Sequence, residues 1–153
     1  MPEKDGAMPG EGADEFDLRG FLPYLLNMAA EESSARFQQY YKGRYGMLRT
    51  EWRVLFHLGR YGAMTAKEIC DRARMHKTKV SRAVAALQAK RFLTRSPRED
   101  DRRHETLALT SQGRHAYADL AAQAQQFDRA LMADFSAEEA RLLRQALVRI
   151  AKL

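Results

Sequence analysis

The chain has 153 residues, 45% of them hydrophobic and 30% charged, with a formal net charge of +6. This length and composition predict one folded domain and argue against a largely disordered chain. No continuous apolar run approaches the roughly 18 residues that span a bilayer, so no membrane partner is expected, and the single cysteine excludes an internal disulfide.

The first 15 residues are rich in glycine, proline and acidic side chains. They lack the basic start and apolar stretch of a secretory signal, which predicts a cytoplasmic protein with a flexible tail over 1–15. We expect one folded domain over 16–153. Within it, apolar residues recur at helical spacing from Asp17 and predict a helix that ends near Gly43 or Gly46. Thr50 is the expected N-cap of a second helix.

A capping-box spacing, Thr65 to Glu68, predicts the start of a short helix that runs to about Ala73. A second helix is expected over about 77–90. The apolar residues of the two helices and the turn between them match a helix-turn-helix, which needs a small residue where the helices cross and an apolar residue in the turn. These residues are Ile69, Cys70, Ala73, Met75, Val80 and Ala83.

Two short strands are predicted over 92–95 and 106–109, joined by a charged tip over 97–104. Thr110 is the expected start of a long helix, and the capping box from Ser136 to Glu139 starts the last one. The expected fold is therefore mainly α with a small β-hairpin, a winged helix-turn-helix. Its DNA-binding lobe would cover about 48–110, with dimerisation helices over 16–45 and 111–153.

The positive charge is concentrated around this lobe. Between Arg72 and Arg103 there are eleven lysines and arginines and three acidic residues, a net charge of +8, so the rest of the chain carries −2. A surface that displaces counterions from DNA phosphates needs such a concentration. On this interpretation the first turns of the second helix enter the major groove, and Arg82 is the candidate base contact. The expected contacts on this helix are Lys77, Thr78, Lys79, Ser81 and Arg82. An ordinary amphipathic helix with a polar outer face would show the same residues.

The segment from Arg95 to Gly113 resembles the wing of the MarR (multiple antibiotic resistance regulator) family. It joins an Asp-x-Arg tip, Asp101 to Arg103, to a strand that ends Leu-Thr and then to a glycine in the next helix. The preceding Thr78-Lys-Val-Ser-Arg82 is similar to that family's recognition helix. The resemblance implies that Arg103 enters the minor groove, oriented by Asp101, and that Arg98 and Arg102 contact phosphates.

The same resemblance implies a homodimer on an inverted-repeat operator, acting as a transcriptional repressor that a small aromatic or phenolic ligand releases. The terminal helices could instead complete a monomeric core. The expected ligand-lining residues are Tyr24, Met28, Trp52, Phe56 and His57, with Phe127 a weaker candidate, although aromatic residues at helical spacing also fill cores.

Other functions have less support. The sequence has no phosphate-binding glycine loop, nucleophile elbow or metal-binding motif, so we expect no enzyme, no catalytic residues, no cofactor and no metal site. A redox- or metal-responsive regulator of the same fold and a non-specific architectural nucleic-acid-binding protein stay open as alternatives. Cys70 is expected to fill a packed position between the two helices and not to act as a redox sensor.

Overall fold

The computed structural model describes residues 16–101 and 103–153, so the predicted tail over 1–15 and the predicted phosphate contact Arg102 lie outside the described residues. The chain divides into two compact units, Met1–Ser33 and Ser34–Leu153. The first unit contains a short 3-10 helix, η1 (Leu18–Gly20), and the beginning of α1 (Leu22–Tyr45). Within the described part of the chain, no helix combines the length and the apolar composition needed to cross a membrane.

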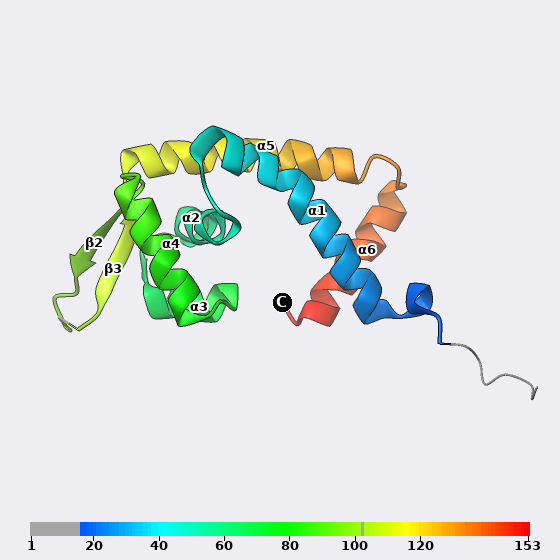
Figure 1. Cartoon of the computed structure of the whole chain (residues 1–153), viewed down its shortest axis with the longest axis horizontal. Coiled ribbons are helices and arrows are strands. Elements are labelled where there is room, and N and C mark those ends of the chain that lie inside the picture. Colours follow the sequence, from blue (N-terminus) through cyan, green and yellow to red (C-terminus); the bar gives the residue numbers. More distant parts are fainter. Residues whose placement is uncertain (1–15, 102) are drawn as a thin grey trace, which may run out of the picture. The chain divides into compact units, whose positions relative to one another are not determined.

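The second unit contains the end of α1 and all the later elements (Figure 1). These are α2 (Arg49–Tyr61), β1 (Met64–Thr65), α3 (Ala66–Ala73), α4 (Lys77–Ala89), β2 (Leu93–Pro97), β3 (Glu105–Leu109), α5 (Ser111–Leu131) and α6 (Ala137–Ala151). The element order confirms a mainly helical winged helix-turn-helix. The helix starts predicted at Thr65, Thr110 and Ser136 are also confirmed, because each of these side chains accepts a backbone N–H three residues later.

Over the residues that the structure describes, the sheet has three strands, not the two that were predicted. Its order is β1-β3-β2, and all pairs are antiparallel. In the wing, Leu93 lies opposite Leu109 and Arg95 opposite Leu107, while β1 adds the pair Met64 and Leu107. The hairpin prediction missed β1 because two residues are too short to show any alternation of apolar and polar side chains.

The predicted N-cap of α2 at Thr50 is wrong, since Leu48 occupies that position. A leucine side chain cannot accept a hydrogen bond, and the helix start is satisfied differently. The carboxylate of Glu51 accepts the backbone N–H of Leu48 at 2.8 Å. Only half of the usual capping box is therefore present, which explains why the Ser/Thr rule pointed to the wrong residue.

Among the described residues of the second unit, an apolar core lies between the end of α1, α2, α3, α4, the sheet and α5. Its largest fully buried side chains are Tyr41, Met47, Leu55, Ile69, Leu87, Leu93, Leu107, Leu120, Val54 and Val80. Because α4 packs against both α2 and α3, the buried side of the recognition helix is fixed and its opposite side faces outward.

Candidate nucleic-acid interface

The recognition helix α4 has a sharp division between its two faces. Val80, Ala83, Val84 and Leu87 are buried. All five predicted DNA contacts on this helix are exposed: Lys77, Thr78, Lys79, Ser81 and Arg82. The helix begins at His76, whose Nδ1 accepts the backbone N–H of Thr78 at 3.2 Å. The first turns of α4 therefore present their polar side chains to solvent on a helix with a defined start.

The turn before α4 has the packing that a helix-turn-helix requires. Ile69, Ala73 and Met75 are buried as predicted, and the N–H of Met75 donates to the carbonyl of Cys70 at 3.2 Å. Cys70 itself packs against the core but stays half-buried, so it is less enclosed than the sequence suggested. In the described part of the chain, no three His, Cys, Asp or Glu side chains form a potential metal site.

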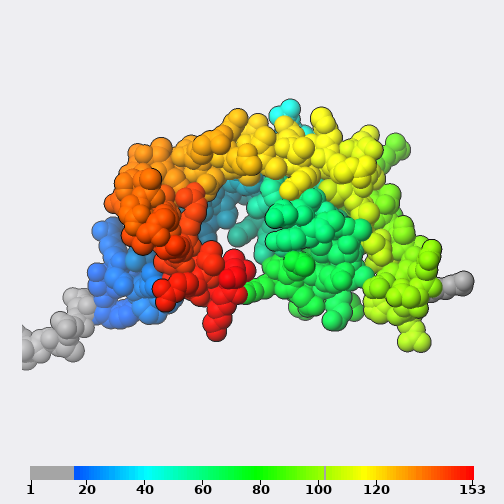
Figure 2. Space-filling model, turned by 180° about the vertical axis from the view of Figure 1, so that it is seen from behind, coloured from blue at the N-terminus to red at the C-terminus, as the bar shows by residue number. Residues whose placement is uncertain are grey.

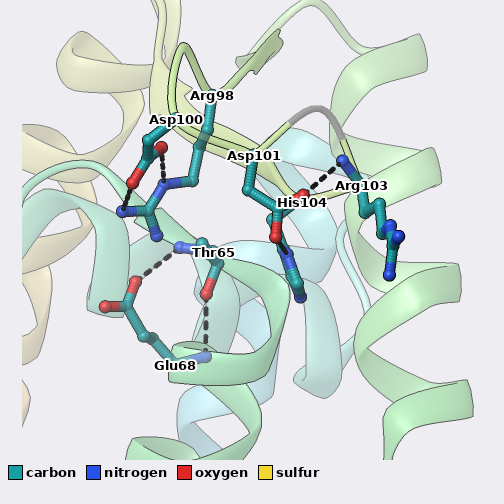
Figure 3. A network of polar contacts seen from close by, with 7 residues as sticks. All are labelled: Thr65, Glu68, Arg98, Asp100, Asp101, Arg103 and His104. Carbon is teal, nitrogen blue, oxygen red and sulfur yellow. Dashed lines mark hydrogen bonds and ion pairs between the residues drawn. The ribbon is translucent and has the colours of Figure 1, made fainter.

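At the tip of the wing, Arg98 is paired with Asp100. The guanidinium donates to both carboxylate oxygens, at 3.0 and 3.1 Å (Figure 3). These hydrogen bonds hold the pKa of the Asp100 carboxyl below its usual value. The pKa of Glu68 is also below its usual value. The main cause is the hydrogen bond from the backbone N–H of Thr65, and the positive charge of Arg98 contributes to the same lowering. The predicted phosphate contact Arg98 thus lies at the tip with its guanidinium already engaged by a carboxylate.

Asp101 organises the other side of the tip. Its Oδ1 accepts the backbone N–H of Arg103 at 3.0 Å, and its Oδ2 lies 2.8 Å from Nδ1 of His104. These contacts, the Arg103 N–H first, lower the pKa of the Asp101 carboxyl. The hydrogen bond between Asp101 and Arg103 runs to the backbone and leaves the guanidinium to extend away from the carboxylate (Figure 3). Asp101 fixes the chain at Arg103, while the exposed Arg103 side chain points outward.

A groove of about 670 Å³ lies between α3, α4 and the wing. It brings together three of the predicted contacts, Lys77, Ser81 and Arg103, from separate elements. Its lining residues are Thr65, Ala66, Lys67, Cys70, Lys77, Ser81, Val84, Arg95, Arg103, His104, Glu105 and Leu107. The lining combines apolar side chains with four cations, Lys67, Lys77, Arg95 and Arg103, a composition suited to the sugars and phosphates of a nucleic-acid backbone.

Two cations of this groove, Lys67 and Arg95, were missed by the sequence analysis. Arg95 follows the buried Leu93 by two positions, so both side chains lie on the same face of β2. That alternation could have placed Arg95 on the side of the sheet facing the groove. Its guanidinium lies 3.4 Å from the Glu105 carboxylate, in an exposed pair. No sequence pattern pointed to Lys67 as a groove residue. It lies between Thr65 and Glu68, and their capping box accounts for this segment without assigning Lys67 a role.

The C-terminal end of α4 is anchored by a buried carboxylate. Glu51, only 2% exposed, accepts a hydrogen bond from Nζ of Lys90 at 2.9 Å while its other oxygen accepts the Leu48 N–H. A buried charge needs such a partner, and here the partner is the residue that ends the recognition helix. The pair joins the start of α2 to the end of α4.

The predicted ligand-lining residues divide between the two units. Tyr24 and Met28 lie in the first unit and are 36% and 39% exposed. In the second unit, Trp52 and Phe56 contact each other edge to face, with ring centroids 4.7 Å apart. They belong to an aromatic cluster with Phe37, Tyr41, Tyr117 and Phe127. His57 Nδ1 lies 2.6 Å from the backbone oxygen of Arg53. Trp52 and Phe56 thus already have partners within a packed cluster.

The fold, the exposed basic face of α4 and the charged wing define a winged helix-turn-helix protein of the DNA-binding class. The MarR family model matches residues 45–104. Over 95 residues the chain is 28% identical to YwoH of Bacillus subtilis (strain 168), an uncharacterized HTH-type transcriptional regulator, and the match covers 62% of this chain and 69% of YwoH.

Two solved structures share the fold over most of the chain. A probable transcriptional regulator from Pseudomonas aeruginosa is 25% identical with a TM-score of 0.77, over 88% of this chain and 99% of that one. BpsR of Bordetella bronchiseptica is 19% identical with a TM-score of 0.80, over 91% and 99% of the two chains. The resemblance seen in the sequence is confirmed to this extent: residues 45–104 match the MarR family model, and the chain shares its fold with solved transcriptional regulators.

Proposed function

We propose that the protein is a sequence-specific double-stranded DNA-binding regulator that acts as a homodimer. The observation that carries this proposal is the shared groove, in which Lys77 and Ser81 of α4 and Arg103 of the wing line one cationic surface. An α-helix with exposed polar side chains suits the major groove, and an outward arginine on a β-finger suits the narrow minor groove beside it. Binding would use both grooves of the duplex.

Exposed apolar side chains support the dimer. On α6, the large hydrophobic residues are between 36% and 50% exposed: Leu142, Leu143, Leu147, Val148 and Ile150. In the first unit, Leu18, Phe21, Leu22 and Leu25 are at least 40% exposed. Apolar surface of this extent on a small protein favours association. A two-fold dimer would place its two recognition helices roughly 34–36 Å apart, which predicts an inverted-repeat operator.

We further propose that the regulator is a repressor released by a small aromatic or phenolic ligand. The DNA binding of BpsR, which shares this fold, is regulated by 6-hydroxynicotinic acid. A ligand that binds more tightly to one arrangement of the two DNA-binding lobes of the dimer shifts the population toward that arrangement. The candidate lining residues stay Tyr24, Met28, Trp52, Phe56 and His57. A panel of hydroxylated aromatic acids, added to the protein–duplex complex, should contain at least one that dissociates it.

The DNA-binding proposal is tested by selection from random-sequence duplexes, followed by titration of the recovered duplex and a scrambled version at several salt concentrations. A specific regulator should enrich an inverted repeat and prefer it by about 10³-fold or more. Strong, salt-dependent binding without preference would instead identify an architectural protein. Absence of binding to any duplex would refute both interpretations.

A further inference from the structure

The turn of the helix-turn-helix contains an arginine in an unfavourable backbone conformation. Arg74 ends α3 with φ 51° and ψ 49°, the left-handed region, and its N–H donates to the carbonyl of Cys70. Glycine is the usual residue there, because a Cβ raises the energy of this conformation by roughly 1 kcal/mol. Retaining a long side chain at such a position suggests that the side chain has a role of its own.

That side chain reaches the far end of the chain. The Arg74 guanidinium donates to the backbone oxygens of Ala151 and Lys152, at 2.8 and 3.3 Å. These carbonyls lie at the C-terminal end of α6, where helix carbonyls lack partners within the helix and the helix dipole is negative. Figure 2 shows the end of α6, in red, against the green helix-turn-helix, and Figure 1 places the C-terminus beside α3.

A second arginine contacts the backbone of the residue just before this turn. Arg53 of α2 donates to the backbone oxygen of Ala73 at 2.5 Å, from a partly buried position. The last residue of α3 is thus tied to α2, and the next residue, Arg74, is tied to α6. Only Met75 and His76 separate Arg74 from the first residue of the recognition helix. If α6 shifts and Arg74 moves with it, the start of α4 is therefore displaced as well.

We propose that Arg74 is a positioning residue that ties the turn of the helix-turn-helix to the C-terminal end of α6. Through this tie, the position of α6 sets the placement of the recognition helix. The tie itself is a property of the fold, while its effect on DNA binding rests on the proposed function. Arg74 acts through the backbone at both ends, without requiring a contact to DNA.

The experiment compares the full-length chain with Arg74→Lys and Arg74→Gly. Lysine keeps the charge but cannot bond two carbonyls with one planar fork. Glycine removes the side chain and relieves the left-handed conformation, so this variant is expected to fold. The matched control is Arg149→Lys, which alters an exposed arginine in the last turn of α6. Hydrogen exchange of backbone amides is measured for each protein.

Both Arg74 variants should exchange roughly threefold to tenfold faster in the last turn of α6 and at residues 75–77, with the control unchanged. Affinity for the inverted-repeat duplex recovered by selection should fall by a similar factor, and Arg74→Lys should keep the parent's salt dependence. Unchanged exchange in both Arg74 variants would overturn the tie. Faster exchange only at α6, with unchanged affinity, would overturn the transmission to α4. If the parent chain binds no duplex, the proposed function fails, but the exchange experiment still decides the tie.

Discussion

The backbone oxygen of Phe92 lies against Gly113, at the junction of the recognition helix, the wing and α5. A Cβ added to Gly113 would overlap this oxygen and approach the rest of the Phe92 backbone. The same oxygen accepts the N–H of Thr110 at 3.1 Å, and the Thr110 hydroxyl donates to the carbonyl of Arg91 at 2.7 Å. The start of α5 is thus hydrogen-bonded to the turn that follows α4, and only glycine allows so close an approach.

Gly113→Ala should therefore lower the free energy of unfolding by about 1–3 kcal/mol, the usual cost of overpacking a closely packed site. Chemical denaturation followed by circular dichroism would measure it. Gly43→Ala is the matched control: Gly43 lies in α1, and an added Cβ would meet no atom within 4 Å. That change should be neutral or stabilising by about 0.5–1 kcal/mol, since alanine favours a helix over glycine. Equal stability of the two variants would mean that the Phe92 contact can relax without cost.

Much of this fold could be predicted because its signals are local. The Thr65 cap, the buried Met75 of the turn and the polar face of α4 all follow from residue spacing. What escaped prediction depends on residues far apart in the sequence. Strand β1 is formed by pairing with β3, in which Met64 lies opposite the distant residue Leu107. The Arg74 guanidinium contacts Ala151 and Lys152, which follow it in the sequence by 77 and 78 positions. The sequence pattern identified Gly113 as part of the wing motif. The structure shows why a glycine is needed there: the backbone oxygen of Phe92 leaves no room for a Cβ.

Lys67 and Arg95, the two groove cations that sequence analysis missed, should contact DNA phosphates. Replacing either by alanine should weaken binding to specific and scrambled duplexes alike and reduce the salt slope by about 1. Titrations at several salt concentrations measure this slope. Lys42→Ala is the control, an exposed lysine of α1 that does not line the groove. A loss confined to the specific duplex would show base contacts instead of phosphate contacts.

Tyr45 should make stability depend on pH in alkaline solution. Burial, together with the hydrogen bond that its hydroxyl donates to Asp119 at 2.5 Å, raises the pKa of Tyr45 to about 12. The unfolded value is about 10, so over this interval the folded state keeps a proton that the unfolded state has lost. The free energy of unfolding should therefore fall as the pH rises from about 10 to 12. The Tyr45→Phe variant should lack this part of the decline in the free energy of unfolding. Its absorbance titration should also lack one tyrosinate step at high pH. Titration of Tyr45 near pH 10 in the parent protein would contradict the assignment.

The exposed apolar face of α6 should be needed for the dimer. Leu147 is 39% exposed, and Leu147→Glu would place a charge on the surface that we expect a second copy to cover. Light scattering after size-exclusion chromatography should show a shift toward the monomer, with a parallel loss of affinity for the inverted repeat. Gln145→Glu adds a charge at an exposed polar position of the same helix and should leave the assembly unchanged. A dimer that tolerates glutamate at residue 147 would place the interface elsewhere.

Arg103 should report on the minor groove. Its backbone N–H is fixed by Asp101, and its exposed side chain extends from the wing tip, so it is placed to enter a groove beside the recognition helix. Narrow A·T tracts have the most negative minor grooves and attract guanidinium groups most strongly. Arg103→Ala should therefore weaken binding more on duplexes with A·T-rich flanks than on those with G·C-rich flanks around the same inverted repeat. The two titrations differ only in the flanks, so the bases read by α4 are held constant. An equal loss on both duplexes would assign Arg103 to the phosphate backbone, where charge matters and groove width does not.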